Sequence, residues 1–466
     1  IAFWPFLEQL LSFFVTSSDL FIATKIGVDA QDTINISDGM GAVVFIMWFG
    51  FVIQGSIMMG ATAIVSRMTG ARDYPQAQHG LHQAAMLGLL AGTISCGLLF
   101  TCSDFMVTHV LTMNETARAY ALQYVYMAAF AAPFSGVVFA INAALRGSGD
   151  TRLPFWIMMS VGILNVIFSV IFVFADAPLG GWRIGGIAAG TVCGYGISMC
   201  ILLFIMLRRR KKIFTGRKNE SLEELVRERG EHYAPPLYLS FSHLRPDMGM
   251  QKRILKIGLP QAVEVFGMWG IQMFCLSIIS ELPVKGVLGV HNIAVRIESL
   301  SFLPGFAIGM AASTLVGQYL GARNALMARI TIWKCMRYAV IFMTGLGVLF
   351  SAFPALFMEI FSNGSTTLID TGIPVLRTML VVEPFFAACI VMKMSLRGAG
   401  DTRRVMLISY GIMGFFRVVC TWVWFRLAPE TMTLWGIWLV FAFEMAVQSA
   451  ILYKIVKGRS WTKLQV

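Results

Sequence analysis

The sequence predicts an all-α membrane protein with twelve transmembrane helices, and three observations lead to this fold class. The chain of 466 residues is 57% hydrophobic and only 13% charged, whereas soluble domains usually carry about 25% charged residues. Its apolar residues form runs long enough to cross ~30 Å of hydrocarbon. Its basic residues collect in alternate connections between these runs. Helices are expected because lipid cannot satisfy free backbone N–H and C=O groups, and the runs are too long for barrel strands.

Twelve segments have the length and apolar character of a membrane-spanning helix. They are 3–27, 38–66, 79–103, 117–145, 153–175, 184–207, 253–281, 286–317, 326–352, 371–396, 404–427 and 433–456. The long polar stretch 208–256 starts RRRKK, continues through the helix-like ESLEELVRERGEH and breaks at Pro235-Pro236. We therefore expect an N-terminal six-helix bundle at 1–207, a linker at 208–252, a C-terminal bundle at 253–457 and a tail at 458–466.

The charge of the connections predicts the orientation. One set of connections, which includes the linker, carries 26 Lys and Arg, and the opposite set carries five. By the positive-inside rule the richer set is cytoplasmic. Linker, tail and both termini are then cytoplasmic, in a multi-pass protein of the plasma (inner) membrane. The basic linker is expected to have some affinity for anionic membrane lipid.

The sequence contains an internal repeat. ALRGSGDTR at 144–152 recurs as SLRGAGDTR at 395–403, an offset of 251 residues, and the same offset aligns MGATAIV at 59–65 with MAASTLV at 310–316. Two units of six spans enter the membrane in the same direction, an arrangement in which transporters hold substrate between the halves. We expect the LRGxGDTR motif to form a structural corner, with its Arg and Asp bonding locally.

Other classes of protein fit poorly. The formal charge of the chain is +12, but its basic residues flank apolar segments and form no soluble basic face. We therefore expect no nucleic-acid partner. The eight Cys form no CxxC pair, which argues against disulfides and zinc. The sequence has no nucleophile elbow, nucleotide loop or His/Cys cluster. A membrane-bound enzyme is therefore disfavoured, and no cofactor is expected. A receptor or structural membrane protein stays open, although the duplication favours a transporter.

Seven charged residues fall near the middle of predicted spans, where a charge costs at least ~2.5–3.5 kcal/mol and marks a candidate functional site. They are Asp19, Glu264, Arg296, Glu298, Glu383, Arg417 and Glu444. Because buried charges need partners, we expect Arg296 and Arg417 to pair with acids among Glu264, Glu298 and Glu383. The six C-terminal residues would form a polar network or contact substrate. Asp19 has no basic partner at similar depth in its half.

Several motifs resemble those of the multidrug and toxic compound extrusion (MATE) family over nearly the whole chain. They are Pro5…Asp19, GATAIVSRMTGARD, ALRGSGDTR, IGLPQAVE, GVHNIAVRIESLSFLPG…LVGQYLGAR and SLRGAGDTR. The resemblance implies two six-helix bundles around a central cavity. It also implies antiport, in which H⁺ or Na⁺ enters while a cationic, often aromatic, compound leaves.

The resemblance also implies a coupling site. The family's first-span acid matches Asp19, its fifth-span Asn matches Asn165 and its sixth-span Thr matches Thr191. These residues are the candidate ligands of a coupling proton or Na⁺. In the DinF-like branch a carboxylate follows the Asn by one turn, and here that position is Ser169. The tenth-span acid of the NorM-like branch aligns with Phe386. We lean towards the DinF-like branch.

We therefore expect a monomeric secondary antiporter that exports cationic or amphipathic small molecules. The alternative within the same superfamily is a lipid-linked oligosaccharide flippase. Such a protein should have a net basic cavity and, in the lipid II flippases, fourteen spans. The excess of mid-depth acids and the twelve predicted spans both favour the antiporter.

Overall fold

The computed structural model describes residues 2–110, 113–176, 179–213, 235–240, 245–284, 286–362 and 365–464. These residues form helices, turns and extended connections, and none of them is in a β-strand. Eleven helices are long and apolar enough to cross a membrane, or up to twelve if a bent pair is counted as one span. The predicted all-α membrane fold is therefore confirmed.

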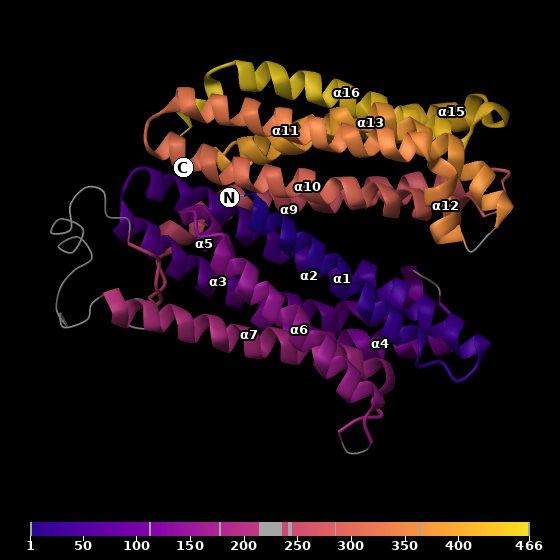
Figure 1. Cartoon of the computed structure of the whole chain (residues 1–466), viewed down its shortest axis with the longest axis horizontal. Helices are drawn as coiled ribbons and strands as arrows, with labels where there is room; N and C mark the ends of the chain where they lie inside the picture. The colour runs from indigo at the N-terminus through magenta and orange to yellow at the C-terminus, as the bar shows by residue number, and fades with distance from the viewer. Residues whose placement is uncertain are drawn as a thin grey trace. The chain divides into compact units, whose positions relative to one another are not determined.

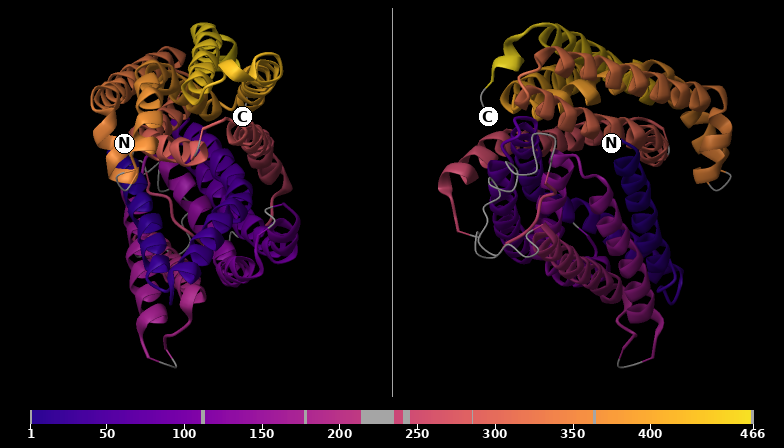
Figure 2. Two further views of the ribbon diagram at one scale, coloured as in Figure 1. Left: turned by 90° about the vertical axis from the view of Figure 1, so that its right-hand side faces the viewer. Right: turned by 60° about the vertical axis from the view of Figure 1, so that its left-hand side comes forward.

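The contacts of the chain define two compact units, which divide at Ala262–Val263. Within each unit the long helices run in a roughly common direction, and the short α12 turns across it (Figures 1 and 2). The helices of the first unit are α1 Phe3–Thr24, α2 Ala30–Gly70, α3 Tyr74–Phe105 with the π-helix η1 Met106–Val110, α4 Glu115–Ala129, α5 Ala131–Ser148, α6 Arg152–Phe174, α7 Arg183–Ile213 and the start of α9 Met248–Ser280.

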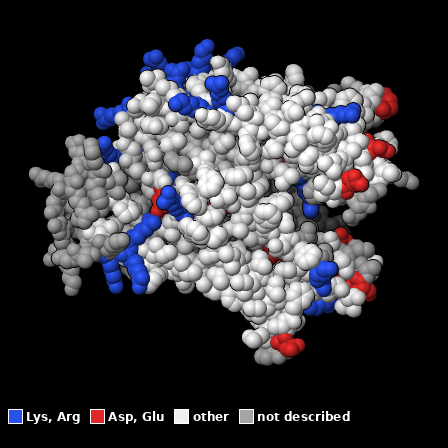
Figure 3. Space-filling view, viewed as in Figure 1, with Lys and Arg blue, Asp and Glu red and all other residues white. Residues whose placement is uncertain are grey.

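The second unit takes the rest of α9 and the helices after it. They are α10 Val287–Gly321, α11 Ala325–Ala352, α12 Pro354–Ser362, α13 Thr366–Gly398, α14 Thr402–Met413, the π-helix η3 Gly414–Cys420, α15 Thr421–Leu427, the 3-10 helix η4 Pro429–Thr431, α16 Leu434–Lys457 and the 3-10 helix η5 Ser460–Lys463. In Figure 3 basic side chains gather mainly at one end of the helices and acidic side chains at the other, a distribution consistent with the predicted orientation.

The span predicted at 117–145 is the bent pair α4–α5, whose helices meet at 52°. Pro133 lies in the first turn of α5, where its missing N–H is not needed. Its counterpart Pro384 lies inside the continuous α13. The two repeats therefore use the same proline differently, and only the first repeat breaks the helix.

The repeat is also visible in unusual backbone conformations. Gly149 and Gly400 both have positive φ, at 97° and 89°, a conformation that glycine adopts without strain. Arg72 and Arg323, also 251 residues apart, have φ of 59° and 57°. The corner predicted at each LRGxGDTR motif therefore has the same backbone conformation in both repeats.

The described part of the linker is attached to α3. The N–H of Tyr238 donates to Gln78 Oε1 at 3.1 Å, that of Ser240 to His82 Nε2 at 3.0 Å, and that of Asp247 to Gln83 Oε1 at 3.0 Å. A hydrogen bond from His79 lowers the pKa of Asp247 below its usual value. The segment ESLEELVRERGEH and its predicted helix lie outside the described residues. The domain boundaries taken from the sequence stay predictions.

Candidate functional site

Asp19 lies in α1, on the face that packs against α6. Val15, one turn before Asp19, lies against Gly162 of α6, where a Cβ would come within 2.7 Å of the valine side chain. The two helices run in the same direction from the same end of the unit, so Asn165 lies near the level of Asp19. Asp19 Oδ1 is buried and has no hydrogen-bond partner among the described residues.

Asn165 and Thr191 come together across α6 and α7. The amide Nδ2 of Asn165 donates to Thr191 Oγ1 at 2.9 Å. Gly190 and Gly194 of α7 allow this approach, because a Cβ on either would lie within 3 Å of the α6 backbone. Small residues bring transmembrane helices together in this way. Two of the three predicted ligand residues are therefore in contact, in a part of the unit where the helices pack closely.

The oxygens of this region suit a cation. Asn165 Oδ1, like Asp19 Oδ1, is buried without a partner within the described residues. The buried Tyr124 lies close enough to Thr191 and to Asp19 to interact electrostatically with both. One carboxylate with neutral oxygens is a ligand set that a hard cation accepts. Ser169, at the position of the second acid in the DinF-like pattern, instead donates to the Ile187 carbonyl at 3.2 Å.

Glu264, the first acid of the C-terminal unit, has partners that differ from those we expected. Its Oε2 lies 2.9 Å from Arg397 of α13, and its Oε1 accepts from Ser409 Oγ at 2.6 Å. Lys393 lies 4.0 Å from Oε1. Arg397 belongs to the second LRGxGDTR motif, so the expectation that this arginine bonds locally is wrong. Glu264 lies at the level of the last turn of α13, closer to a helix end than its place in the sequence indicates.

The same correction applies to the first repeat. Arg146 Nη1 donates to both carboxylate oxygens of Glu8, at 3.0 and 3.1 Å. Both side chains are nearly buried, with exposed fractions of 7% and 10%. Each LRGxGDTR arginine therefore reaches a buried glutamate on the first helix of its half. Glu8 and Lys393 were not among the predicted site residues.

Arg417 pairs with Glu444, an acid that we had not expected as its partner. Arg417 Nη2 and Nε lie 2.8 and 2.9 Å from Glu444 Oε2, and the guanidinium lies 4.2 Å from the centre of the Phe441 ring. Arg417 sits in the π-helix η3, an irregularity that is frequent at functional sites. Arg417 of η3 and Glu444 of α16 therefore neutralise each other.

Glu383 and Glu298 form the acidic part of the C-terminal unit. Glu383 is fully buried and accepts a short hydrogen bond from Ser301, and its Oε2 has no further partner in the described part of the chain. The exposed Arg296 makes no ion pair with a described residue, so the pairing expected for it is not found. Of the predicted network, Arg417–Glu444 and Glu264 are neutralised. Glu298 and Glu383 interact electrostatically with each other and make no ion pair with a described residue, although Arg417 also acts electrostatically on Glu298.

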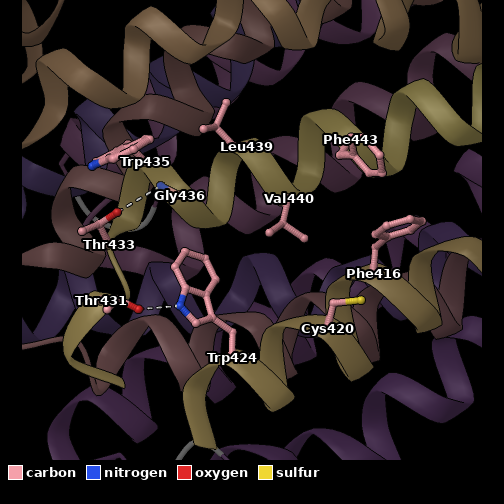
Figure 4. Close-up of a pocket in the computed structure, with 10 residues that line it drawn as sticks. All are labelled: Phe416, Cys420, Trp424, Thr431, Thr433, Trp435, Gly436, Leu439, Val440 and Phe443. Carbon is pink, nitrogen blue, oxygen red and sulfur yellow. Dashed lines mark hydrogen bonds between the residues drawn. The ribbon is translucent and has the colours of Figure 1, made fainter. Parts of the chain in front are cut away.

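A pocket of about 480 Å³ lies between η3–α15 and α16. Figure 4 shows its aromatic wall, with the Trp424 indole N–H donating to Thr431 at 2.9 Å. Trp435 and Phe443, at its rim, are 45% and 61% exposed. Its lining holds no carboxylate or base, so the pocket offers aromatic and apolar contacts only, with the hydroxyls of Thr431 and Thr433.

Comparison with known proteins identifies the family. The family model described as MatE matches residues 35–171 and 260–423. The chain belongs to the MatE family. It is therefore a membrane transporter, and the resemblance read from its motifs is confirmed at the level of the family. The DinF-like lean stays a prediction.

Relatives align over most of their own length. The chain is 24% identical over 432 residues to a probable multidrug resistance protein NorM of Thermotoga maritima, covering 92% of this chain and 86% of the relative. It is 21% identical to the uncharacterised transporter YisQ of Bacillus subtilis, covering 98% and 93%. In both cases the match runs through both six-helix repeats.

Solved structures match the fold. An outward-facing multidrug resistance MATE family transporter superposes with a TM-score of 0.83 at 16% identity, covering 100% of this chain and 96% of that one. A MOP superfamily transporter of Pyrococcus furiosus, described as having reverse polarity of its binding pocket, gives a TM-score of 0.84 at 16% identity with the same coverage. At such identities the likeness concerns the fold alone.

Proposed function

We propose that this chain exports amphipathic, mainly cationic compounds across the plasma (inner) membrane in exchange for H⁺ or Na⁺. The substrate class is supported by relatives named multidrug resistance proteins, among them the NorM proteins of Vibrio vulnificus and Vibrio cholerae. The protein would act as a monomer and as a transporter without enzymatic chemistry or cofactor.

The observation that carries the coupling proposal is the pair of unpartnered oxygens on Asp19 and Asn165. Among the described residues, each lacks a hydrogen bond although it is buried. An unsatisfied buried carboxylate oxygen is costly unless a proton or cation supplies the missing interaction. Asp19 would therefore bind the coupling ion, with Asn165, Thr191 and Tyr124 contributing neutral groups around it.

Ion binding would change how α1 packs. Neutralising Asp19 removes the cost of burying its charge, so α1 can pack more tightly against α6 and α7. Pro5 lies in the first turn of α1, where its missing N–H removes no helical hydrogen bond, so we expect α1 to move as a whole helix. The loaded and unloaded states would then favour different positions of α1, and substrate release would follow from that difference.

Transport in proteoliposomes tests the proposal. Efflux of a cationic dye should be driven by a pH gradient alone or by a Na⁺ gradient alone, and whichever gradient works identifies the ion. Absence of dye movement under both gradients, with correctly folded and inserted protein, would contradict antiport. Pyranine trapped inside the vesicles would report the counter-movement of protons directly.

The orientation is tested separately. A cysteine at Lys218→Cys, in a cysteine-free background, should resist membrane-impermeant thiol reagents added outside intact cells, because the linker is expected to be cytoplasmic. The matched control is Glu430→Cys in the connection before α16, which should label readily. The opposite labelling pattern would reverse the proposed topology.

A further inference from the structure

An extended stretch of the linker is buried in the first unit. Residues 235–240 form neither helix nor strand, yet Leu237, Leu239 and Ser240 have exposed fractions of only 4%, 2% and 0%. The two leucines belong to one buried cluster that also contains Leu81 of α3, Ile141 of α5, Leu153 of α6 and Leu202 of α7. We call residues 237–240 the plug, because they pack among these helices at the end of the unit where α7 passes into the linker.

Side chains of α3 hold the plug through its backbone. Gln78 forms two hydrogen bonds with Tyr238, because its Oε1 accepts from the N–H at 3.1 Å and its Nε2 donates to the carbonyl oxygen. His82 follows Gln78 by four residues and so lies on the same face of the helix. Its Nε2 accepts from the N–H of Ser240 at 3.0 Å. An amide side chain does not titrate, so of these two contacts the one made by His82 depends on pH.

The contact between His82 and the plug requires a neutral imidazole. Nδ1 of His82 lies 2.8 Å from the carbonyl oxygen of Gln78, which can only accept, so Nδ1 carries a proton. Nε2 must then be bare, because it accepts from the backbone of Ser240. An imidazolium has an N–H on both nitrogens and would set two donors against each other. It would also enclose a charge at a side chain that is 1% exposed, which is costly. Protonation therefore favours the state in which the plug has left His82.

The charges on the surrounding elements act in the same direction. At this end of the unit the described residues include the bases Arg67 of α2, Arg152 of α6, Arg209 and Arg210 of α7, and the acids Asp150 after α5 and Asp247 before α9. Asp150 pairs with Arg209 at 2.8 Å, and Asp247 pairs with His79 at 2.9 Å. Arg210 acts electrostatically on Tyr238 of the plug. Both acids have partners and the bases outnumber them, so a further positive charge on His82 is unfavourable while the plug encloses it.

The chain beyond the plug is attached by contacts that acid does not weaken. Gln83 donates to the carbonyl oxygen of Arg245 at 2.7 Å and accepts from the N–H of Asp247 at 3.0 Å, and its amide does not titrate. A proton on His79 strengthens the attraction between its imidazole and the Asp247 carboxylate. Falling pH therefore weakens the hold on the plug while it preserves the attachment at residues 245–247, which can act as a hinge.

We propose that the plug is a pH-dependent closure of the first unit, seated while His82 is neutral and released when His82 is protonated. The seated state binds one proton fewer than the released state, so falling pH shifts the population towards release. In the proposed orientation this end of the unit faces the cytoplasm. Acidification of the cytoplasm would then free the ends of α3, α5, α6 and α7 to move apart. The closure does not depend on the role of Asp19 or on which ion drives transport.

Distances between two spin labels in the purified full chain test the closure. The labels are attached at Gln76→Cys in α3 and Pro236→Cys beside the plug, two exposed positions, in a cysteine-free background. The distance is measured at about pH 8 and about pH 5, the limits between which an imidazole ordinarily changes its charge. We expect one short-distance population at the higher pH and the loss of most of it to longer distances at the lower pH. His82→Gln keeps an acceptor for Ser240 but cannot be protonated, so it should hold the short distance at both values. His79→Gln is the matched control and should respond as the parent does.

Amide hydrogen exchange tests the closure without any substitution, and it decides alone if His82→Gln does not seat the plug at the higher pH. Protection factors are corrected for the intrinsic pH dependence of exchange. Those of the Leu239 and Ser240 amides should fall by about tenfold or more between the two pH values, because release exposes them to solvent. The Asp247 amide, which donates to Gln83, should keep its protection. The proposal would be overturned by unchanged distances or unchanged protection of the plug in the wild type. It would equally be overturned by release of the plug in His82→Gln at the lower pH, or by loss of the response in His79→Gln.

Discussion

The two units differ in the balance between buried acids that are paired with arginines and buried acids that are not. The first unit pairs Glu8 with Arg146 at 3.0 Å and also keeps Asp19, whose buried Oδ1 no described residue satisfies. The second unit binds Glu264 and Glu444 to arginines at 2.9 and 2.8 Å. A paired acid holds its charge and fixes its neighbours, whereas an acid among neutral groups can exchange its counter-ion. In the second unit Glu383 likewise keeps a buried oxygen without a described partner. Under the proposed function Asp19 would be the exchangeable acid, while the acids paired with arginines would stay fixed.

The largest effect should come from Asp19→Asn. This variant keeps the shape but removes the titratable charge, so gradient-driven efflux in proteoliposomes should fall to the level of empty vesicles while expression and folding stay normal. Asp38→Asn, which changes an exposed acid of the same unit, should transport normally. Wild-type rates in Asp19→Asn under both ion gradients would move the coupling site to the acidic pair Glu298 and Glu383.

A second comparison concerns the two corner arginines. Arg146→Met leaves Glu8 buried with no cation, and should lower the free energy of unfolding by ~3–5 kcal/mol. Arg397→Met should cost less, because Lys393 still lies 4.0 Å from Glu264. Unfolding in mixed micelles measures both values. Equal losses would show that Lys393 does not compensate the charge of Glu264.

The smallest effect is expected at Thr191. Thr191→Val removes the hydroxyl that accepts from Asn165 at 2.9 Å. Loss of one such hydrogen bond is worth about 0.5–1.5 kcal/mol, so the apparent affinity for the coupling ion should fall by roughly two- to tenfold. The same exchange at the exposed Thr93 of α3, whose hydroxyl donates to the Leu89 carbonyl at 2.8 Å, serves as the control. An unchanged ion dependence in Thr191→Val would remove this residue from the site.

The fold could be predicted from the sequence because the length and apolar character of each run are local properties. The 52° bend between α4 and α5 could not, since Pro133 and Pro384 occupy equivalent positions while only one helix breaks. Asn165 and Thr191 were assigned as candidate ligands from motifs that match the family, and they lie in contact. Whether this contact lies near Asp19 depends on the rotation of α1 about its axis. The small residue Gly162 indicates that rotation only once α1 is known to pack against α6.

The ion pairs were harder to predict, because depth along a span does not specify which helices are neighbours. The apparent depth of Glu264 predicts a partner such as Arg296 or Arg417, whereas its partner Arg397 belongs to a motif that the sequence assigns to a corner. Lys393 was overlooked although it precedes Arg397 by four residues, a spacing that places both on one helix face. The second repeat has Lys393 and Arg397 where the first has Asn142 and Arg146. This pair of bases on one helix face was the signal in the sequence that could have revealed the partners of Glu264.

The attachment of the linker to α3 bears on how the gene can be divided. The first unit extends to Ala262, and a Cβ at Gly60 of α2 would lie 2.2 Å from the Ile254 carbonyl oxygen of α9. The first unit can therefore be completed only after the linker and the first turns of α9 have been translated. A half-length polypeptide ending at the sixth span would expose Gln78, His82 and Gln83 of α3, and so would present the quality-control machinery with an unfinished surface.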